Sequence, residues 1–551
     1  MRMKKIVIIV LLLGIFAFLS ISSIVKESGT CDEIAHHIAT GAVFLEKGDL
    51  KMSTESPPLP RYIVATPIAC FLKPVLPDSK DVWRNQDRAA FSRDFFFKYN
   101  NNSKQMLFAS RLVVIILGII LGILLFIWSN KMYGERVALF ALFIYCFSPN
   151  ILAHTRLATT DMITTFFMFL SLFTFWLFLQ NPSKMRIILA GFCLGLGQLS
   201  KYSMLILYPI FVILYIVAIN KDKNLSKRAN AYSLLLIFII SVFAIWAGYG
   251  FRIEPILVDA MRAGEKLEFA FMLVEKNFAA YQGTIKPVLE SFLLEFPMPL
   301  GEHILGFFGV LRHSHEGHLT YFCGQWSQKG NPLYFVVSFL IKTPIPIIIL
   351  FLMGLIASIR KRLSTSDCFL IIPFFVYFII ALGSNLQVGI RHLLPIYPLC
   401  FIISARSIYL FRHRLSKTII AFFSLWIILG TIMIYPHFLS YFNEIAGGPD
   451  NGWRYLRDSN IDWGQDLPAL STYIKENKID VITLAYFGED LPKEYGIKEI
   501  PFKETEHTRP ENKVYAISVQ GLDSVKWTKD YTPDAKMGYS IFVYDFRDKK
   551  L

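Results

Sequence analysis

Two adjacent carboxylates and two histidines directly follow the first apolar run of the chain. Asp32, Glu33, His36 and His37 lie within six positions, in the stretch SGTCDEIAHHIATGAVF. A carboxylate can take the proton of an acceptor hydroxyl, so the cluster can supply a general base. On a helix, Asp32 with His36 and Glu33 with His37 form i,i+4 pairs that could bind a metal ion. The signature H-E-x-x-H is absent, so a divalent metal is an alternative that is not favoured, and simple helix capping is a second alternative.

Further charged residues stand at the edges of other apolar runs. Asp161 opens one run in LATTDMITTF, Lys201 separates two runs in GQLSKYSML, and Arg391 and His392 open another in GIRHLLPIYP. Any one of them could be a capping group or a side chain that snorkels at a membrane boundary. Lys and Arg can also hold a phosphate and stabilise the charge of a leaving group. Several such groups at one depth favour a shared active site.

The elements that must position these residues are membrane-spanning helices. Of the 551 residues, 54% are hydrophobic and 18% are charged, whereas about 25% are charged in an average soluble protein. This composition predicts a mainly α fold, a polytopic helical bundle of about eleven spans. We expect the spans near residues 5–25, 109–128, 136–150, 160–180, 186–200, 203–219, 231–249, 333–357, 368–384, 391–409 and 418–436.

The placement of Lys and Arg predicts the orientation. With a cytoplasmic N-terminus, the inside segments include MRMKK, NKDKNLSKR and IRKRLSTSD, whereas the short outside turns hold only Arg156, Lys201 and Arg391. This asymmetry follows the positive-inside rule. The first apolar run has a basic start and no clear A-x-A site after it, which favours an uncleaved span over a signal peptide. The net charge of +14 is spread over short clusters between apolar runs, so we expect no nucleic-acid partner.

This topology divides the chain into two predicted domains. Residues 1–436 form the polytopic membrane domain, with large outer loops at 26–108 and 250–332. Residues 437–551 form a small extracytoplasmic α/β domain. The tail contains the β-type runs VITLAYFG, KVYAISVQGL and YSIFVYDF, preceded by the helical stretch DLPALSTYIKENK. The chain is therefore expected to be a multi-pass protein of the plasma (inner) membrane with its C-terminus outside the cytoplasm.

The tail also has a dense stretch of polar and aromatic residues, GPDNGWRYLRDSNIDWGQDL. Trp463 could stack on the apolar face of a sugar while Asp462 accepts hydroxyl protons. A capped helix start is the alternative interpretation of the same residues. We expect this stretch to pack back on the membrane domain and to line the acceptor side of the site, with Trp463 near the outer ends of the spans.

Carboxylates combined with Lys and Arg at an outer membrane boundary suit glycosyl transfer from a polyprenyl-phosphate sugar, whose leaving group carries one phosphate. The alternative is a multi-span transporter or flippase of a lipid-linked or anionic substrate. Charges near the bilayer midplane and internal repeats are typical of transporters, and the sequence shows no repeat. A scaffold that binds partners through its tail would not need these charges on separate loops.

Several motifs resemble bacterial members of the protein O-mannosyltransferase family, within the C-type glycosyltransferases that also include the lipid A aminoarabinose transferase. They are the Asp-Glu pair, ESPPLP, LATTD, GLGQLSKYS, FLIKTPIP and RHLLPIYP, and they cover roughly residues 1–436. The resemblance implies an inverting membrane glycosyltransferase with a polyprenyl-phosphate-linked donor. It implies that Asp32 is the catalytic base beside Glu33 and that Asp161 is the second acidic residue, and it makes Lys201 and Arg391 phosphate contacts. The tail departs from the eukaryotic members, so the acceptor stays open between protein, glycolipid and glycan. No cofactor is assigned.

Overall fold

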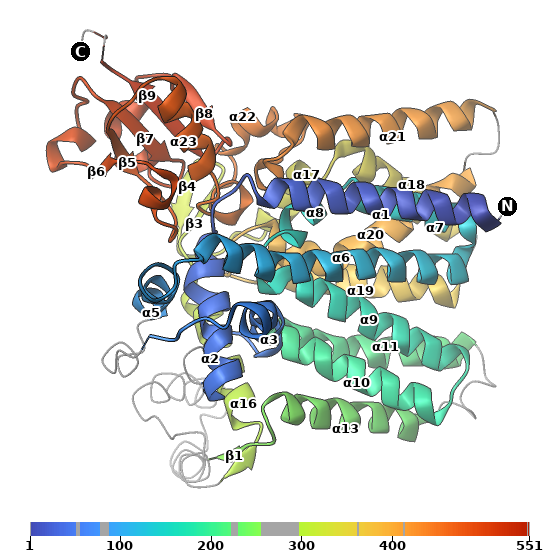
Figure 1. The fold of residues 1–551 in the computed structure, drawn as a ribbon. Helices are drawn as coiled ribbons and strands as arrows, with labels where there is room; N and C mark the ends of the chain where they lie inside the picture. The colour runs from blue at the N-terminus through green and yellow to red at the C-terminus, as the bar shows by residue number, and fades with distance from the viewer. Residues whose placement is uncertain are drawn as a thin grey trace, which may run out of the picture.

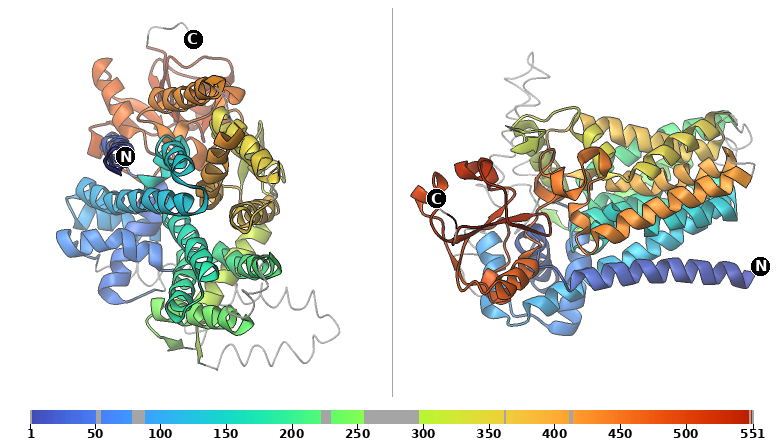
Figure 2. Two further views of the ribbon diagram at one scale, coloured as in Figure 1. Left: turned by 90° about the vertical axis from the view of Figure 1, so that its right-hand side faces the viewer. Right: turned by 90° about the horizontal axis from the view of Figure 1, so that it is seen from above.

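The computed structural model describes residues 2–50, 55–77, 88–221, 230–254, 297–360, 363–410, 414–547 and 549. Long helices lie side by side in a bundle, and a unit with a β-sheet lies at one end of it (Figure 1). The view from above shows the same separation of bundle and sheet (Figure 2). We call this end of the bundle the sheet end and the opposite one, where the chain begins, the N-terminal end. Residues 51–54, 78–87 and 255–296 of the predicted outer loops lie outside the described residues.

Each of the eleven predicted spans is helical. They correspond to α1 (Arg2–Ile24), α6 (Ser103–Tyr133), α7 (Glu135–Cys146) with α8 (Pro149–Thr155), α9 (Thr160–Gln180), α10 (Lys184–Ser200), η4 (Tyr202–Ile206) with α11 (Leu207–Lys221), α13 (Ala231–Gly248), α17 (Tyr334–Lys342) with α18 (Ile345–Arg360), α19 (Thr365–Leu382), η6 (Ile390–Ile396) with α20 (Tyr397–Ala405) and η7 (Arg406–Leu410), and α21 (Arg414–Ile434).

In the described part of the chain, eight helices are long and apolar enough to cross a membrane, or up to ten if each of two bent pairs is one span. The eleventh predicted segment is α10, which has 17 residues. That length is at the lower limit of about 17–25 residues for a span. The chain is thus an integral membrane protein, and the prediction of a mainly α polytopic bundle is confirmed.

The two bent pairs break at prolines. The axis turns by 63° between α7 and α8 and by 110° between α17 and α18. Pro149 and Pro344 stand at these breaks, and proline both lacks an N–H and disfavours helix in the preceding residue. Side chains satisfy the freed carbonyls at the end of α17: the amide of Asn443 donates to two of them and that of Asn150 to a third. Such compensation is required where a helix is interrupted at membrane depth.

The long connections between spans lie at the sheet end. Figure 1 places α2, α3, α5 and α16 there, where the large outer loops are predicted. The elements of these loops are η1 (Glu33–Ile38), α2 (Ala39–Lys47), α3 (Leu59–Pro67), η2 (Ile68–Leu72), α5 (Arg88–Asp94), η3 (Phe95–Tyr99), β1 (Ile253–Glu254), β2 (Met298–Pro299), α16 (Gly301–Glu316), β3 (Thr320–Phe322) and β4 (Gln325–Ser327).

The tail forms a five-stranded mixed sheet in the order β6-β5-β7-β9-β8. β5 pairs in parallel with β6 and β7, whereas β9 runs antiparallel to β7 and β8. The three predicted strands and the predicted helix are present, so the α/β class of the tail is confirmed. Its elements are η8 (Phe438–Ser440), η9 (Glu444–Ala446), α22 (Pro449–Gly452), η10 (Asp458–Asn460), α23 (Leu467–Glu476), β5 (Ile482–Ala485), η11 (Pro492–Tyr495), β6 (Glu499–Ile500), η12 (Glu504–His507), β7 (Val514–Ser518), η13 (Leu522–Ser524), η14 (Lys526–Lys529), β8 (Ala535–Met537) and β9 (Ile541–Asp545).

The sheet packs on both faces, because side chains alternate along a strand. Tyr515 and Ile517 of β7 belong to the main core, which is continuous with the membrane helices. Val514 and Ala516 of the same strand belong to a second, smaller core shared with Leu470 of α23. One face of β7 therefore belongs to the core that continues into the bundle, and the other face packs against α23.

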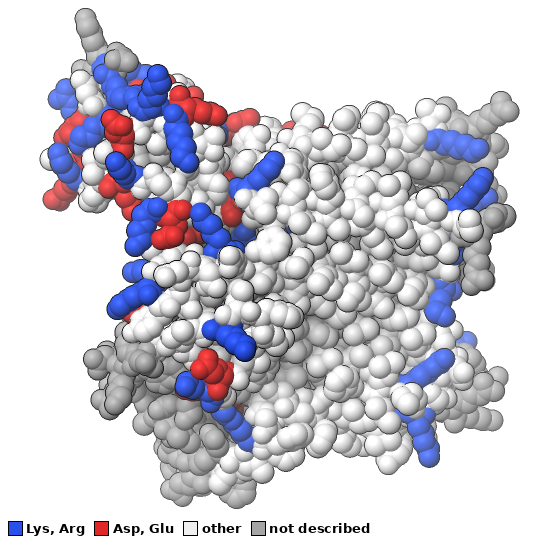
Figure 3. Space-filling view, viewed as in Figure 1, with Lys and Arg blue, Asp and Glu red and all other residues white. Residues whose placement is uncertain are grey.

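Charges divide along the bundle axis. On the face shown in Figure 3, Lys and Arg mark the N-terminal end, both signs of charge occur at the sheet end, and the band between them is nearly free of charge. An uncharged band between charged ends is expected for a protein that spans a bilayer.

Candidate active site

Four of the predicted site residues form one chain of ion pairs at the sheet end. The Arg391 Nη1 atom lies 2.8 Å from Asp32 Oδ2 and 3.7 Å from Asp161 Oδ2. The Lys201 Nζ atom lies 2.9 Å from Asp161 Oδ1. The order is therefore Asp32, Arg391, Asp161, Lys201, and we call it the ion-pair chain. Lys201 and Arg391 are thus held near each other by the carboxylate of Asp161, which both contact.

The four residues come from four separate elements. Asp161 is in the first turn of α9, where the helix dipole favours a negative charge. Lys201 is the extended residue between α10 and η4, and Arg391 is the second residue of η6. Asp32 immediately precedes η1 and makes no side-chain cap bond, so the capping interpretation of Asp32 is wrong.

Exposure differs along the ion-pair chain. The Asp161 side chain is fully buried, whereas 22% of Asp32 and 24% of Lys201 are exposed. Solvent therefore reaches a carboxylate at one end and an ammonium group at the other. Burial would raise the pKa of the Asp32 carboxyl, but the guanidinium of Arg391 and the rings of His36 and His37 outweigh burial and hold that pKa below its usual value. Asp32 is therefore ionised at neutral pH.

Glu33 has a different set of partners from Asp32. Its carboxylate accepts two hydrogen bonds from Arg111, from Nε at 2.8 Å and from Nη2 at 2.6 Å. The backbone N–H groups of Ala158 and Thr30 donate to the same carboxylate at 2.8 and 2.9 Å. Neither Glu33 nor Arg111 is more than 2% exposed. Because Glu33 is fully engaged, the pair of Glu33 and His37 offers no metal site.

The remaining histidines lie beside the ion-pair chain. The His392 ring stacks on Phe335 with a centroid distance of 6.2 Å. The Nδ1 atom of His36 lies 3.9 Å from a carboxylate oxygen of Glu55. The residues from Glu33 to Ile38 form a π-helical turn, a local geometry that is often found at functional sites.

Residues 457–466 of the tail form hydrogen bonds to the backbone beside both Asp32 and Arg391, and we call them the docking segment. Carbonyl groups of Gln465 and Trp463 accept hydrogen bonds from the N–H groups of Ser28 and Cys31, each at 2.9 Å. The second contact ends one residue before Asp32. On the Arg391 side, the side-chain oxygen of Asn460 accepts a hydrogen bond at 2.9 Å from the N–H of Ile390, the residue directly before Arg391.

Gly389 makes the contact between Asn460 and Ile390 sterically possible. Its φ is +133°, and a Cβ atom at this position would lie 2.5 Å from Ser459 Oγ. A side chain on residue 389 would thus push the docking segment away from the turn that carries Arg391.

Trp463 and Asp462 lie inside this interface. The Arg391 guanidinium carbon is 4.3 Å from the centre of the Trp463 ring, a cation–π geometry. Trp463 also makes an edge contact with His154 and is 2% exposed. It therefore lies at the sheet end of the spans, where its ring packs on Arg391. Asp462 is buried and accepts hydrogen bonds from the Ser518 hydroxyl and the Gly464 N–H, and burial raises its pKa to about 8.

Sequence reasoning missed Arg111, which holds Glu33. The available signal was a single arginine near the start of an apolar run, in SRLVVIILG. A charged residue inside a predicted span calls for a partner, but the packing of α1 on α6 was needed to identify it.

Residues 101–246 match the sequence model of the dolichyl-phosphate-mannose-protein mannosyltransferase family. The predicted resemblance to the protein O-mannosyltransferases is therefore confirmed over this region, which contains Asp161 and Lys201 but neither Asp32 nor Arg391. A comparison with curated protein sequences gave no significant match.

Solved structures of membrane glycosyltransferases are similar at low identity. ArnT from Cupriavidus metallidurans bound to undecaprenyl phosphate is 11% identical, with a TM-score of 0.49 and 97% of each chain covered. AglB from Archaeoglobus fulgidus, in complex with an inhibitory peptide and a dolichol-phosphate, is 15% identical with a TM-score of 0.49, covering 87% of this chain and 58% of that one. The Saccharomyces cerevisiae Pmt1-Pmt2 complex bound to the sugar donor is 14% identical with a TM-score of 0.36, covering 45% and 33%.

Proposed function

We propose that the chain transfers a sugar from a polyprenyl-phosphate-linked donor to an acceptor at the outer face of the membrane, with inversion at the anomeric carbon. One observation carries this proposal: the ion-pair chain combines an accessible carboxylate with an accessible ammonium group and a shared guanidinium. It lies at the end of an apolar bundle, where the lipid part of a donor could stay in the membrane while its sugar meets the solvent. The matched family is one of lipid-phosphate-sugar-dependent transferases by its description.

The proposal includes an orientation. The N-terminal end of the bundle, rich in Lys and Arg, faces the cytoplasm in accordance with the positive-inside rule. The sheet end, with residues 437–551 as an extracytoplasmic domain beside the membrane domain 1–436, then lies outside the inner membrane.

Lys201 and Arg391 would hold the donor phosphate. Both cations contact Asp161, whose side chain is fully buried beneath them. Asp161 thus fixes the two cations at one point, and a phosphate that approaches from the exposed side of Lys201 would meet both. Hydrogen bonds from charged donors to a phosphate are about twice as strong as neutral ones.

Asp32 would act as the general base. The acceptor oxygen attacks the anomeric carbon, and its proton passes to Asp32 as the new C–O bond forms. The bond from the anomeric carbon to the phosphate oxygen breaks on the opposite face, and its electron pair leaves with the polyprenyl phosphate. Lys201 and Arg391 stabilise the negative charge that grows on this leaving group.

Arg391 would link donor binding to the base. In the present structure its guanidinium pairs with Asp32 at 2.8 Å, which lowers the basicity of that carboxylate. A phosphate at Arg391 would share the guanidinium charge, and the pKa of Asp32 would then rise toward its usual value. The base would thus be strongest when the donor is in place.

The other predicted residues would support this centre. Glu33 would hold η1 through its ion pair with Arg111. The ring of Trp463 would position Arg391, and Asp462 would join the docking segment to β7 through Ser518. His392, one residue after Arg391, would contribute to the donor side. The acceptor, whether protein, glycolipid or glycan, would approach from the tail side.

The test is an assay of the purified full-length protein with labelled polyprenyl-phosphate sugars, hexoses and pentoses, and membrane or envelope acceptors. We expect transfer of label to an acceptor with release of polyprenyl phosphate. A transporter or flippase would instead move an intact donor across a vesicle membrane. Transport without consumption of any donor would contradict the proposal.

A further inference from the structure

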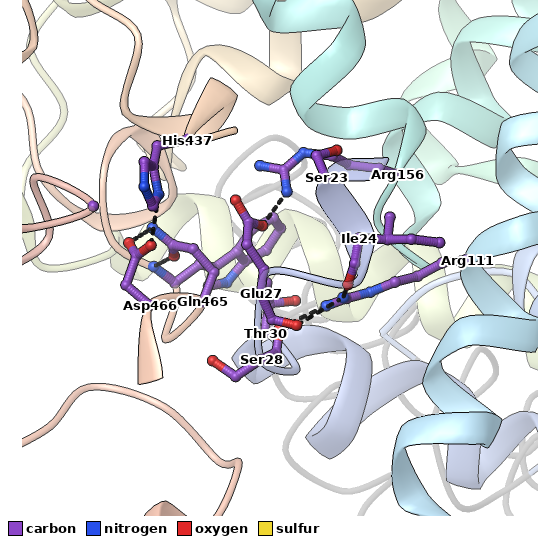
Figure 4. Close-up of polar contacts among 12 residues, drawn as sticks. Ser23, Ile24, Glu27, Ser28, Thr30, Arg111, Arg156, His437, Gln465 and Asp466 are labelled. Atoms are coloured by element: carbon purple, nitrogen blue, oxygen red, sulfur yellow. Dashed lines mark hydrogen bonds and ion pairs between the residues drawn. The ribbon is translucent and has the colours of Figure 1, made fainter. Parts of the chain in front are cut away.

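A second cluster of polar groups, two of them fully buried, lies outside the ion-pair chain and takes no part in the proposed reaction. It contains Glu27, which follows α1, His437, which follows α21, and Asp466, which precedes α23. One ligand atom from each residue lies within 4.8 Å of the others. Figure 4 shows the carboxylate of Glu27 between Arg156 on one side and the pair of His437 and Asp466 on the other.

The carboxylate of Asp466 is held firmly. Its Oδ1 atom lies 2.9 Å from His437 Nδ1. Its Oδ2 atom accepts hydrogen bonds from Gln465 Nε2 at 2.7 Å and from Ser540 Oγ at 2.6 Å. The side chain of Asp466 is fully buried, whereas 21% of His437 is exposed.

Glu27 leaves one oxygen without a partner. Arg156 pairs with its Oε2 atom, but Oε1 is buried and makes no hydrogen bond. The side chain is fully buried. A buried acceptor without a partner costs about 1–3 kcal/mol, and more if it is charged. This free oxygen is therefore available to bind a cation.

We propose that Glu27, His437 and Asp466 bind a divalent transition-metal ion of the Zn²⁺ or Mn²⁺ class. One ring nitrogen and two carboxylate oxygens are a donor set that these ions accept. With the His437 ring neutral, as a metal ligand must be, the two carboxylates outnumber the single charge of Arg156, and a bound cation offsets the difference. Arg156, Gln465 and Ser540 would orient the ligand carboxylates, as groups around metal sites commonly do.

The ion would act as a clamp between the first span and the tail. Glu27 precedes Ser28 and Asp466 follows Gln465. The cluster therefore lies next to the backbone hydrogen bonds that join residues 28–31 to the docking segment. The cation thus joins α1, the end of α21 and the docking segment. It lies outside the ion-pair chain, and the inference does not depend on the proposed glycosyl transfer.

The test uses untagged full-length protein in detergent, treated with a chelator and then loaded with Zn²⁺ or Mn²⁺. Metal content is measured by mass spectrometry after free ions are removed, together with the melting temperature. We expect about one tightly bound ion per chain and a higher melting temperature on loading. Glu27→Gln and His437→Gln should each lower the affinity at least about tenfold, the effect typical of lost groups around a metal, whereas His507→Gln elsewhere in the tail should not.

A second measurement uses only the wild-type chain and so does not depend on the folding of a variant. Co²⁺ bound at this site should give visible absorption bands, and loading with Zn²⁺ should remove them. Wild-type protein that retains no divalent ion, or variants at Glu27 and His437 that retain the ion with unchanged affinity, would overturn the proposal. In that case a proton shared by His437 and the two carboxylates satisfies the cluster.

Discussion

Asp32 and Glu33 are neighbours in the chain, and each pairs with an arginine, yet the two pairs differ in access to solvent. Asp32 and Arg391 are 22% and 13% exposed, whereas Glu33 and Arg111 are fully buried or 2% exposed. Asp32 keeps one short contact to a guanidinium, while Glu33 accepts bonds from a guanidinium and two backbone N–H groups. Two ion pairs of the same chemistry thus differ in access: the carboxylate of Asp32 can be reached by a substrate, whereas the carboxylate of Glu33 is sealed and can only support the structure.

The Asp32→Asn substitution should abolish the function proposed for the accessible carboxylate. The amide keeps the shape but cannot take the acceptor's proton, and loss of a general base costs about 10²–10⁴-fold in rate. We expect this loss in the initial transfer rate, with a melting temperature close to that of the wild type. Near wild-type turnover would remove Asp32 from the mechanism.

The Glu33→Gln substitution should disrupt the buried ion pair with Arg111. Removing one partner of a buried ion pair leaves an uncompensated charge and typically costs about 3–5 kcal/mol. The expected result is a large drop in melting temperature and in the yield of folded protein, with Glu46→Gln, an exposed change in the same outer loop, as control. A stable Glu33→Gln protein that has lost only activity would show that Glu33 belongs to the catalytic centre.

Lys201→Met should weaken donor binding without unfolding the protein, because Lys201 is exposed on one side. Hydrogen bonds to charged groups contribute about 1.5–3 kcal/mol, so the donor dissociation constant should rise roughly tenfold to a hundredfold. Lys221→Met, at the opposite end of the bundle, is the matched control. Equal donor affinity in the two variants would make Lys201 a snorkelling side chain.

Asp462→Asn should change how stability depends on pH. The pKa of Asp462 is raised to about 8, so between its ordinary value and about 8 the folded chain binds a proton that the unfolded chain lacks. Its contribution to stability is complete at low pH and is lost as the pH rises through this window, by up to about 1.4 kcal/mol per pH unit. Asparagine cannot ionise, so the variant should lose less stability than the wild type from pH 5 to pH 8. Parallel melting curves across this range would refute the assignment.

Much of the membrane region could be predicted because its signals are local. Apolar runs indicate spans, and the positions of Lys and Arg place Asp32, Asp161, Lys201 and Arg391 at one end. That prediction brought together residues that are up to 359 positions apart. The alternation in the tail likewise predicted β5, β7 and β9, whereas the edge strands β6 and β8 have only two and three residues and carry no such pattern.

What could not be predicted depends on packing between distant segments. The residues around Asp32 and Glu33 do not predict how differently the two side chains are exposed, because that difference arises from Arg111 on α6 and from the docking segment. Trp463 shows the same limit: the sequence predicted that its stretch packs on the ends of the spans, but its burial against Arg391 depends on the fit of the tail to η6.

The most direct test of the account is a single-turnover experiment with one labelled polyprenyl-phosphate sugar that the wild type accepts. Wild-type and Asp32→Asn proteins are loaded with this donor, acceptor is added, and the release of polyprenyl phosphate is followed. We expect the wild type to release one polyprenyl phosphate for each sugar transferred, and the variant to keep its donor bound and intact. A variant that releases polyprenyl phosphate at the wild-type rate, or a wild type that binds no such donor, would contradict it.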